Sequence, residues 1–483
     1  MALANESTLQ NDAPAPFEAS DERFHAFLQS VEAGEDYRKA WEELLATIPA
    51  ELALRAEWGS RESVGAAALL ASVPANANVL VVGSGLLGTA PALALLGMRV
   101  TIADASPGRL RFVKLRFQHL QYPEPQCEIV RGELSNIPDA HFDLVVLPDA
   151  PAGLPRVEHG AKDNLHFWIR EAFRSLKPGG ECVLLASNRF GYKRYTGLHG
   201  KFERRGGAFL RRVFSITNEE LTPRGYARRL RNAGFDIVQR YVPYVSHLDY
   251  HNLVNVAADR WPRIDLGPQE RKNLLKSAGY AAGLFQWLAP SVLLIGRKPG
   301  GAIARETLLN KTIRQYFSKT KNPDTTFRIE HLLATRGNAA IALVKSPAES
   351  LVFRVPLCPK EIRLGQIHQD CLLQFRKLSE NIKIPRARGI YQFDGVSVFV
   401  ESREAGMISS QHTGLPTRAR TYLQLAEQLA LLQIQTDVGT DALIENAVAA
   451  RARMVAGRMR NPSVAKDILQ ISQNCAELLR GRR

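Results

Sequence analysis

Two kinds of apolar spacing alternate along the chain up to about residue 300. Short continuous apolar runs predict buried strands, and apolar residues spaced three to four apart predict amphipathic helices between them. The predicted strands cover 79–82, 98–103, 127–130, 143–147, 182–186, 235–243 and 291–297. The predicted helices include 89–96, 108–120, 164–176 and 222–233. This alternation predicts a doubly wound α/β sheet with parallel strands.

The regions on either side of this sheet have different patterns. Residues 21–57 have helical spacing and predict a helical cap, preceded by a polar leader that we expect to be disordered. After a linker at 297–301, residues 326–355 predict three short strands, and a helix follows at about 365–380. A hairpin at 390–401 turns at Asp394-Gly395, and 417–483 read as helical. We therefore expect three regions: 1–57, 58–300 and 301–483.

Length and composition agree with a multidomain globular protein. A chain of 483 residues is too long for a single core. The cysteines number five, are scattered and lack metal-ligand spacing, so we expect neither a disulfide nor a metal site, and a cytoplasmic location. No apolar run is long enough to cross a membrane. The formal charge of +15 favours acidic partners without saying which kind.

A glycine loop follows the first predicted strand directly. The loop Gly83-Ser84-Gly85-Leu86-Leu87-Gly88 leads into a helix, and the next strand ends on Asp104. Glycines allow a ligand to approach the backbone closely, and an acid about 20 residues further on is placed to accept hydrogen bonds from ribose hydroxyls. The pattern predicts an adenosine-type cofactor. By itself it fits a nicotinamide or flavin as well as any other.

Later features narrow the choice. Glu133 follows the third predicted strand, the strand "FDLVVL" ends near Asp149, and "LKPGG" at 176–180 separates a predicted helix from a strand, with Pro178 expected to stop that helix. With these motifs, residues 60–300 resemble a class I S-adenosylmethionine-dependent methyltransferase. The resemblance implies a Rossmann-like seven-stranded sheet that ends in an antiparallel hairpin, here "NAGFDIVQRYVPYV" and "SVLLIGRKP". It also implies S-adenosyl-L-methionine as the cofactor.

The resemblance assigns roles to particular residues. Gly83 and Gly85 would line the methionine part of the cofactor, Asp104 would hold the ribose, and Glu133 would approach the adenine. The full set of expected cofactor contacts is Gly83, Ser84, Gly85, Gly88, Asp104, Ala105, Glu133 and Asp149. Val81 and Leu87 depart from the family's usual glycine-loop pattern. Two alternatives therefore stay open: a non-catalytic interaction protein with a degenerate site, and an NAD(P)-dependent oxidoreductase.

The segment 187–231 is rich in arginine and lysine with interleaved aromatic residues. Following a cofactor-site strand, it could receive an anionic substrate through charge-assisted hydrogen bonds, although it could equally be solvated surface. We expect Asp149, Asn188 and Tyr192 to act in catalysis, and Arg189, Lys193, Arg204 and Arg205 to bind substrate. The expected acceptor is small or lipid-linked and anionic, methylated on oxygen or nitrogen. Nucleic acid is the alternative substrate.

Residues 326–436 resemble the N-terminal lobe of the aminoglycoside and choline phosphotransferase type of kinase. The resemblance rests on the strands "FRIEHLLAT", "AAIALVKS" and "SLVFRVPL" and on the segment "IPRARGIYQFDGVSVFVESREAG". Arg354 stands where the family has its phosphate-binding lysine, and neither a catalytic loop nor a metal-binding motif is recognisable. We therefore expect an α+β region without kinase activity that serves in packing, dimerisation or partner binding.

Overall fold

The computed structural model describes most of the chain in detail. The described residues are 22–48, 56, 61–83, 87–130, 136–156, 163–191, 220–245, 247–248, 250–256, 287, 289–301, 306–320, 325–335, 338–378, 385–404, 469–470 and 473. The chain divides into two compact units. The first comprises 1–264, 271–369 and 388–403, and the second comprises 265–270, 370–387 and 404–483. The contacts described below lie within the first unit.

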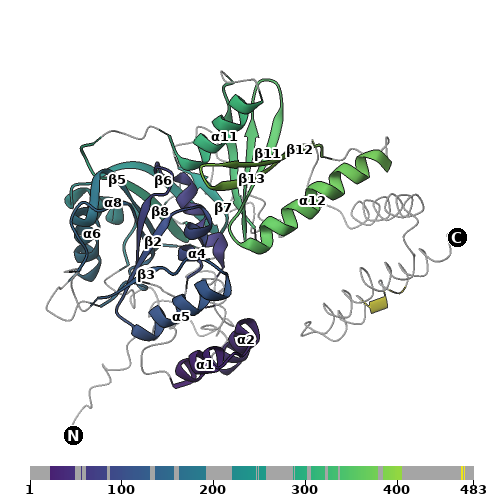
Figure 1. The fold of residues 1–483 in the computed structure, drawn as a ribbon. Helices are drawn as coiled ribbons and strands as arrows, with labels where there is room; N and C mark the ends of the chain where they lie inside the picture. Colours follow the sequence, from purple (N-terminus) through teal and green to yellow (C-terminus); the bar gives the residue numbers. More distant parts are fainter. Residues whose placement is uncertain are drawn as a thin grey trace, which may run out of the picture. The chain divides into compact units, whose positions relative to one another are not determined.

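Helices and strands alternate through the first unit, as Figure 1 shows. The strands before residue 300 are β1 (Asn78–Val82), β2 (Arg99–Asp104), β3 (Gln126–Ile129), β4 (Phe142–Ala150), β5 (Leu176–Ser187), β6 (Asp236–Val245), β7 (Tyr250–Asn255) and β8 (Ser291–Arg297). The helices there are α1 (Glu22–Glu32), α2 (Tyr37–Thr47), the 3₁₀ helix η1 (Glu62–Leu70), α4 (Thr89–Leu95), α5 (Pro107–His119), α6 (Asn164–Ser175) and α8 (Pro223–Asn232). Each strand and helix predicted for this region is present, and most agree within a few residues, although β5 begins at Leu176 and the predicted strand at 182.

The sheet has the order β3-β2-β1-β4-β5-β8-β6 at its methyltransferase-like end. β1 pairs in parallel with β2 and β4, β4 pairs in parallel with β5, and β8 lies antiparallel between β5 and β6. Parallel strands place all their carboxyl ends at one edge, where ligands bind in open α/β sheets. The predicted doubly wound fold and its closing antiparallel hairpin are thus confirmed.

The turn around "LKPGG" differs from the prediction. We expected the preceding helix to extend to residue 176, with Pro178 ending it. Instead α6 ends at Ser175 and β5 begins at Leu176, which pairs with Phe142 of β4. Gly179 has a φ of +82°, and its N–H donates to the carbonyl of Lys298 at 3.0 Å. The glycines therefore join β5 to the end of β8, a contact that a single-chain pattern does not reveal.

The N-terminal helices pack on α5 through aromatic rings. Phe27 contacts Trp41 and Phe112, with ring centroids 5.7 and 5.9 Å apart. Phe24 and Leu28 are fully buried in the same cluster. Burying large aromatic side chains is the main source of stability for such a contact. The predicted helical cap is confirmed for the described residues 22–48.

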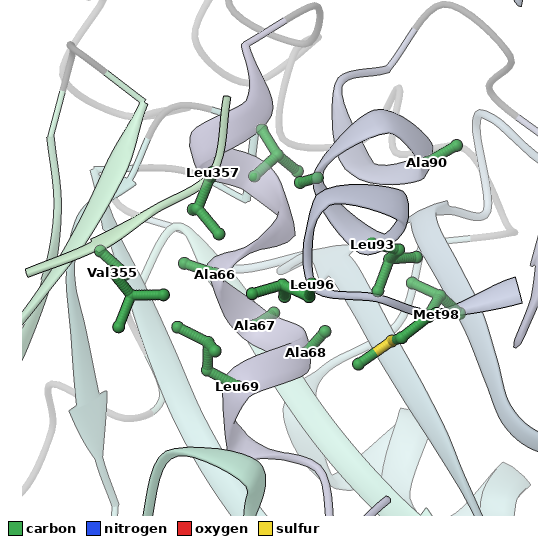
Figure 2. Packing of buried hydrophobic residues seen from close by; sticks show 14 of the residues in the cluster. Ala66, Ala67, Ala68, Leu69, Ala90, Leu93, Leu96, Met98, Val355 and Leu357 are labelled. Atoms are coloured by element: carbon green, nitrogen blue, oxygen red, sulfur yellow. The ribbon is translucent and has the colours of Figure 1, made fainter. Parts of the chain in front are cut away.

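The 3₁₀ helix η1 was not predicted, because its run of small residues has no helical periodicity. All nine of its residues are buried. A Cβ at Gly65 would lie 2.3 Å from the Cβ of Ala92, so glycine lets η1 touch α4. Figure 2 shows Val355 and Leu357 on one flank of η1, and Leu93 of α4 and Leu96 directly after α4 on the other. η1 thereby connects the α4 side of the core with the strands that follow residue 300.

The strands after residue 300 extend the same sheet. β9 (Arg328–Ala334), β10 (Ala339–Lys345), β11 (Ser350–Pro356), β13 (Val396–Ser402) and β12 (Ala387–Phe393) continue it beyond β7, and β7 pairs with β9 at Asn252 and Leu253. Two further helices in the described part of the chain are α11 (Leu308–Lys319) and α12 (Pro359–Leu378). The β12–β13 turn at Asp394 and Gly395 has φ values of +50° and +86°, as the hairpin prediction requires. β7 and α11 were not predicted.

The domain boundary at residue 300 and the helical C-terminal segment remain predictions. The boundary expected at residue 300 stays a prediction, although strands from both sides of it lie in one sheet. The helical reading of 417–483 falls almost wholly outside the described residues. Among the described helices, none combines the length and the apolarity that a membrane crossing requires.

Candidate functional site

The turn after β1 is held in the conformation that only glycine adopts easily. Gly83 has a φ of +71°, and its N–H donates to the carbonyl of Ala103 at 2.7 Å. A Cβ at this position would lie 2.0 Å from the carbonyl oxygen of Gly153. The loop after β4 therefore contacts the glycine turn directly. Two of the segments in which we predicted site residues meet at the carboxyl edge of the sheet.

Gly88 closes the glycine loop for a related reason. A Cβ there would lie 2.2 Å from the carbonyl oxygen of Arg61, so the residue before η1 approaches the start of α4. Gly88 is predicted to bind cofactor, and its close contact here is with protein backbone. The cofactor role of Gly88 remains a prediction.

Asp104 ends β2 at the position expected for the ribose-binding acid. Its carboxylate is fully buried and accepts a hydrogen bond from the N–H of Ser106 at 2.9 Å. The Nε of Arg109 lies 3.3 Å from the same oxygen, within ion-pair distance. Ala105, also predicted to contact cofactor, is half-buried beside it. The acid is thus held in a fixed orientation by the first turn of α5.

A buried polar atom near these residues has no hydrogen-bond partner: the hydroxyl oxygen of Thr89, the first residue of α4 after the glycine loop. Buried polar atoms in native proteins nearly always have a partner, which can be a ligand. A hydroxyl and a carboxylate beside a glycine turn match the polar groups of an amino-acid nucleoside. The residues present fit S-adenosylmethionine. Ser84, Gly85 and Glu133 lie outside the described residues.

A buried hydrogen-bonded pair lies at the end of β4. Asp149 and His247 are 6% and 5% exposed, and the Nε2 of His247 lies 2.7 Å from the Oδ1 of Asp149. The Nδ1 of His247 lies 3.2 Å from the Oγ of Ser291, and the backbone N–H of His247 donates to that oxygen at 3.0 Å. Contacts at both ring nitrogens therefore hold the imidazole in place. With Asp149 ionised, Nε2 carries the proton and Nδ1 accepts from the serine hydroxyl.

These three residues come from strand ends that the sheet brings together. Asp149 is the next-to-last residue of β4, Ser291 is the first residue of β8, and His247 follows the end of β6 by two residues. Ser291 pairs with Ser187 at the end of β5. Sequence reasoning predicted Asp149 but missed His247 and Ser291. The available signal was a histidine a few residues after the strand predicted at 235–243. The residues that contact His247 depend on the order of the strands, which periodicity does not give.

Asn188 directly follows β5 and is 1% exposed. Its side-chain amide donates to the carbonyls of Trp287 and Ala289, each at 2.7 Å, and its Oδ1 accepts from the N–H of Phe190 at 3.2 Å. Asn188 therefore fixes the backbone that leads into β8. The structure gives it this positioning role, and its predicted part in catalysis remains a prediction.

Arg189 lies next to Asn188 and is half-buried. Its Nε has no hydrogen-bond partner, while its backbone N–H donates to the carbonyl of Leu221 at 3.1 Å. Its predicted role in substrate binding is thus compatible with its surroundings and remains untested. The other residues predicted from this segment, Tyr192, Lys193, Arg204 and Arg205, lie outside the described residues.

Comparison with protein families gives one assignment. Residues 80–184 match the model of the methyltransferase domain family. The matched segment runs from β1 to β5 and contains Gly83, Asp104 and Asp149. A comparison with curated proteins gave no match to this chain.

Comparison with solved structures finds methyltransferases at low similarity. A putative methyltransferase from Bacillus halodurans C-125 has a TM-score of 0.30 and 17% identity, over 49% of this chain and 98% of that one. A Thermotoga maritima methyltransferase, titled a possible histamine N-methyltransferase, has a TM-score of 0.31 and 14% identity, over 57% and 99%. Geranyl diphosphate C-methyltransferase from Streptomyces coelicolor A3(2) has a TM-score of 0.30 and 13% identity, over 47% and 75%.

The assignment therefore rests on the family match and on the sheet. The order β3-β2-β1-β4-β5-β8-β6, with β8 antiparallel, is the arrangement that the methyltransferase prediction required and that the oxidoreductase alternative did not explain. The segment 80–184 is a class I S-adenosylmethionine-dependent methyltransferase domain, and the protein is a methyltransferase whose cofactor is S-adenosylmethionine.

Proposed function

We propose that the protein transfers a methyl group to an oxygen or nitrogen atom of a small or lipid-linked anionic acceptor. The observation that carries the proposal is the buried pair of Asp149 and His247 at the carboxyl end of β4. This edge of the sheet also holds Gly83 and Asp104, so the pair lies on the side where the methyl donor binds.

The cofactor would be held by the glycine turn at Gly83, by the hydroxyl of Thr89 and by Asp104, with Arg109 fixing the acid. When bound, it supplies an electrophilic methyl group on a sulfonium. The task left to the protein is to orient the acceptor atom and to remove its proton.

Asp149 is suited to take that proton. An acceptor oxygen or nitrogen that gains a methyl group must lose a proton, and an ionised carboxylate at hydrogen-bond distance can receive it. His247 donates to Asp149 and is held from its other side by Ser291, so the carboxylate keeps one orientation. In this proposal Asp149 is the catalytic residue and His247 a positioning residue.

Positive charge near the same edge favours an anionic acceptor. Arg189 follows β5 with a buried nitrogen that has no hydrogen-bond partner, and the segment after it is rich in arginine and lysine. Guanidinium groups bind phosphates and carboxylates through paired hydrogen bonds. Nucleic acid shares this chemistry, so a nucleic-acid acceptor is a possible outcome of the assay below.

The proposal also covers the strands after residue 300 and the location of the protein. We propose that the strands β9–β13 with α12 form a kinase-lobe-like region without kinase activity, which serves in packing, dimerisation or partner binding. The antiparallel order β9-β10-β11-β13-β12 and Arg354 at the place of the expected lysine support this reading. We also propose a cytoplasmic location, which free cysteines among the described residues support.

The test is a methyl-transfer assay with tritiated S-adenosylmethionine and a fractionated extract of the native cell. Asp149→Asn should lower transfer by about 10²–10⁴-fold, the usual contribution of a general base. Asp143→Asn is the matched control, because Asp143 lies at the other end of β4 and pairs with Lys177. Equal transfer by the wild type and Asp149→Asn would refute the proposed role.

Binding of S-adenosylhomocysteine by the same variants separates two roles of Asp149. If Asp149 acts on the acceptor, Asp149→Asn binds S-adenosylhomocysteine as the wild type does. If it contacts the cofactor, as the family resemblance also implies, the affinity falls together with the transfer rate. The label should appear in acid-soluble or lipid fractions. Label confined to nucleic acid would replace the small anionic acceptor with the alternative.

A further inference from the structure

A cavity of about 100 Å³ lies where β6 and β8 meet the start of α8. Its lining combines two arginines, a tryptophan, a serine and apolar side chains: Pro223, Arg224, Arg240, Tyr241, Val242, Val256, Trp287, Ser291, Val292 and Leu294. A water molecule occupies about 30 Å³ in the liquid. The cavity therefore has room for a group the size of a phosphate.

The two arginines bring positive charge that no carboxylate balances in the described part of the chain. The ion pairs found there include Arg229 of α8 with Asp163 but none with Arg224 or Arg240. Burial, together with the positive charges of Arg231 and Arg224, lowers the pKa of Arg240. Like charges held close together are destabilising unless an anion lies between them. Both arginines are solvent-accessible, so a ligand can reach them from water.

The position of Arg224 is fixed by its surroundings. Its guanidinium carbon lies 4.1 Å from the centre of the Trp287 ring, a cation–π contact that orients the side chain. The backbone of Trp287 is in turn held by the side-chain amide of Asn188, at 2.7 Å. Asn188, predicted from the sequence as a site residue, thus positions one wall of the cavity. A pre-oriented arginine loses less entropy when it binds an anion.

The cavity adjoins the pair at the end of β4. Ser291 lines the cavity, and its hydroxyl contacts His247, which pairs with Asp149. A group anchored between Arg224 and Arg240 would therefore place the rest of its molecule near Asp149. The apolar side chains of Val242, Val256 and Leu294 form part of the lining, and a lower local polarity strengthens a charge-assisted hydrogen bond.

We propose that this cavity binds the phosphate monoester group of the methyl acceptor, with Arg224 and Arg240 as its ligands. A dianion matches two guanidinium groups better than a singly charged carboxylate does. That the phosphate belongs to a methyl acceptor rests on the proposed function. That the cavity binds an anion rests on the residues that line it.

The test is calorimetric titration of the full chain with inorganic phosphate and with glycerol 3-phosphate. Arg224→Gln and Arg240→Gln should each weaken binding at least tenfold. Arg228→Gln is the matched control, because Arg228 is an exposed arginine of the same helix that does not line the cavity, and it should bind as the wild type does. Arg240→Lys, which keeps the charge, should bind with intermediate affinity, and thermal unfolding confirms that each variant is folded.

Further arms identify the source of the phosphate and separate the two proposals. Sedimentation with phosphatidic acid vesicles, compared with phosphatidylcholine vesicles, reports a lipid-linked source if Arg240→Gln abolishes it. Absence of saturable phosphate binding, or equal weakening by Arg228→Gln, would overturn the cavity assignment and leave methyl transfer standing. Binding that depends on Arg240, in a protein that transfers no methyl group, would overturn the proposed function and keep an anion site.

Discussion

Replacement of Gly83 by alanine tests the contact on which the glycine turn depends. Gly83 has a φ of +71°, and an added Cβ would lie 2.0 Å from the carbonyl oxygen of Gly153. The left-handed conformation costs an alanine about 1–2 kcal/mol. The steric overlap forces backbone shifts that cost roughly another 1–3 kcal/mol. We expect Gly83→Ala to lose about 2–5 kcal/mol of unfolding free energy in all.

Gly97→Ala is the matched control for this substitution. Gly97 has a φ of +79°, close to that of Gly83, but its added Cβ would meet nothing nearer than 3.7 Å. It should therefore lose about 1–2 kcal/mol, the conformational cost alone. Urea unfolding of both variants measures the difference, which reports the contact of the glycine turn with the loop after β4.

Cofactor affinity gives the second measurement on the same pair of variants. Gly83→Ala displaces the turn that would hold S-adenosylhomocysteine, so its dissociation constant should rise at least tenfold, or about 1.4 kcal/mol. Gly97→Ala should bind as the wild type does, because Gly97 lies beyond the end of α4. Equal stability losses and unchanged affinity in both variants would refute the reasoning.

Three further predictions concern ionisable groups elsewhere in the fold. Arg297→Met removes the ion-pair partner of the fully buried carboxylate of Glu181, while the hydrogen bond from the N–H of Ser72 remains. The variant should lose about 3–5 kcal/mol of unfolding free energy in urea. Glu181→Met/Arg297→Met should regain most of this, and an Arg297→Met variant as stable as the wild type would contradict the prediction. A hydrogen bond from Lys311 lowers the pKa of Asp394, so its contribution is present above pH ~4 and lost as the pH falls through the lowered value. As the pH falls below ~4, the unfolding free energy of Asp394→Asn should therefore decrease less than that of the wild type. Parallel acid-unfolding curves for the two proteins would disprove this. Burial raises the pKa of the Cys182 thiol to about 12, so iodoacetamide at pH 8 should leave Cys182 unmodified in the native protein and modify it in urea, as mass spectrometry can show.

The sequence predicted the parallel strands well because burial on both faces makes them continuous apolar runs. β1 at 78–82 and β2 at 99–104 agree with the predicted 79–82 and 98–103. Periodicity failed where small residues or partner strands decide the structure. η1 is rich in alanine and other small residues and has no apolar stripe. β7 is short and partly polar, and its pairing with β6 and β9 holds it.

The candidate site was predicted in part for similar reasons. Gly83, Asp104 and Asp149 each follow or end a strand, so their common edge could be inferred from the parallel pattern alone. His247, Ser291 and Arg240 reach the site only because β8 inserts antiparallel between β5 and β6. The family resemblance implied that β8 pairs antiparallel with its neighbours. The side chains that this pairing brings together depend on the register between the strands, which the sequence does not show.

The most direct test of the account is calorimetric titration of the full chain with S-adenosylhomocysteine and, separately, with NADH. The central claim is that the carboxyl ends of β1 and β2 hold the methyl donor, with Asp104 as its ribose ligand. The account predicts saturable, one-to-one binding of S-adenosylhomocysteine that Asp104→Ala abolishes, and no binding of NADH. Binding of NADH alone, or binding of S-adenosylhomocysteine that Asp104→Ala leaves unchanged, would contradict it.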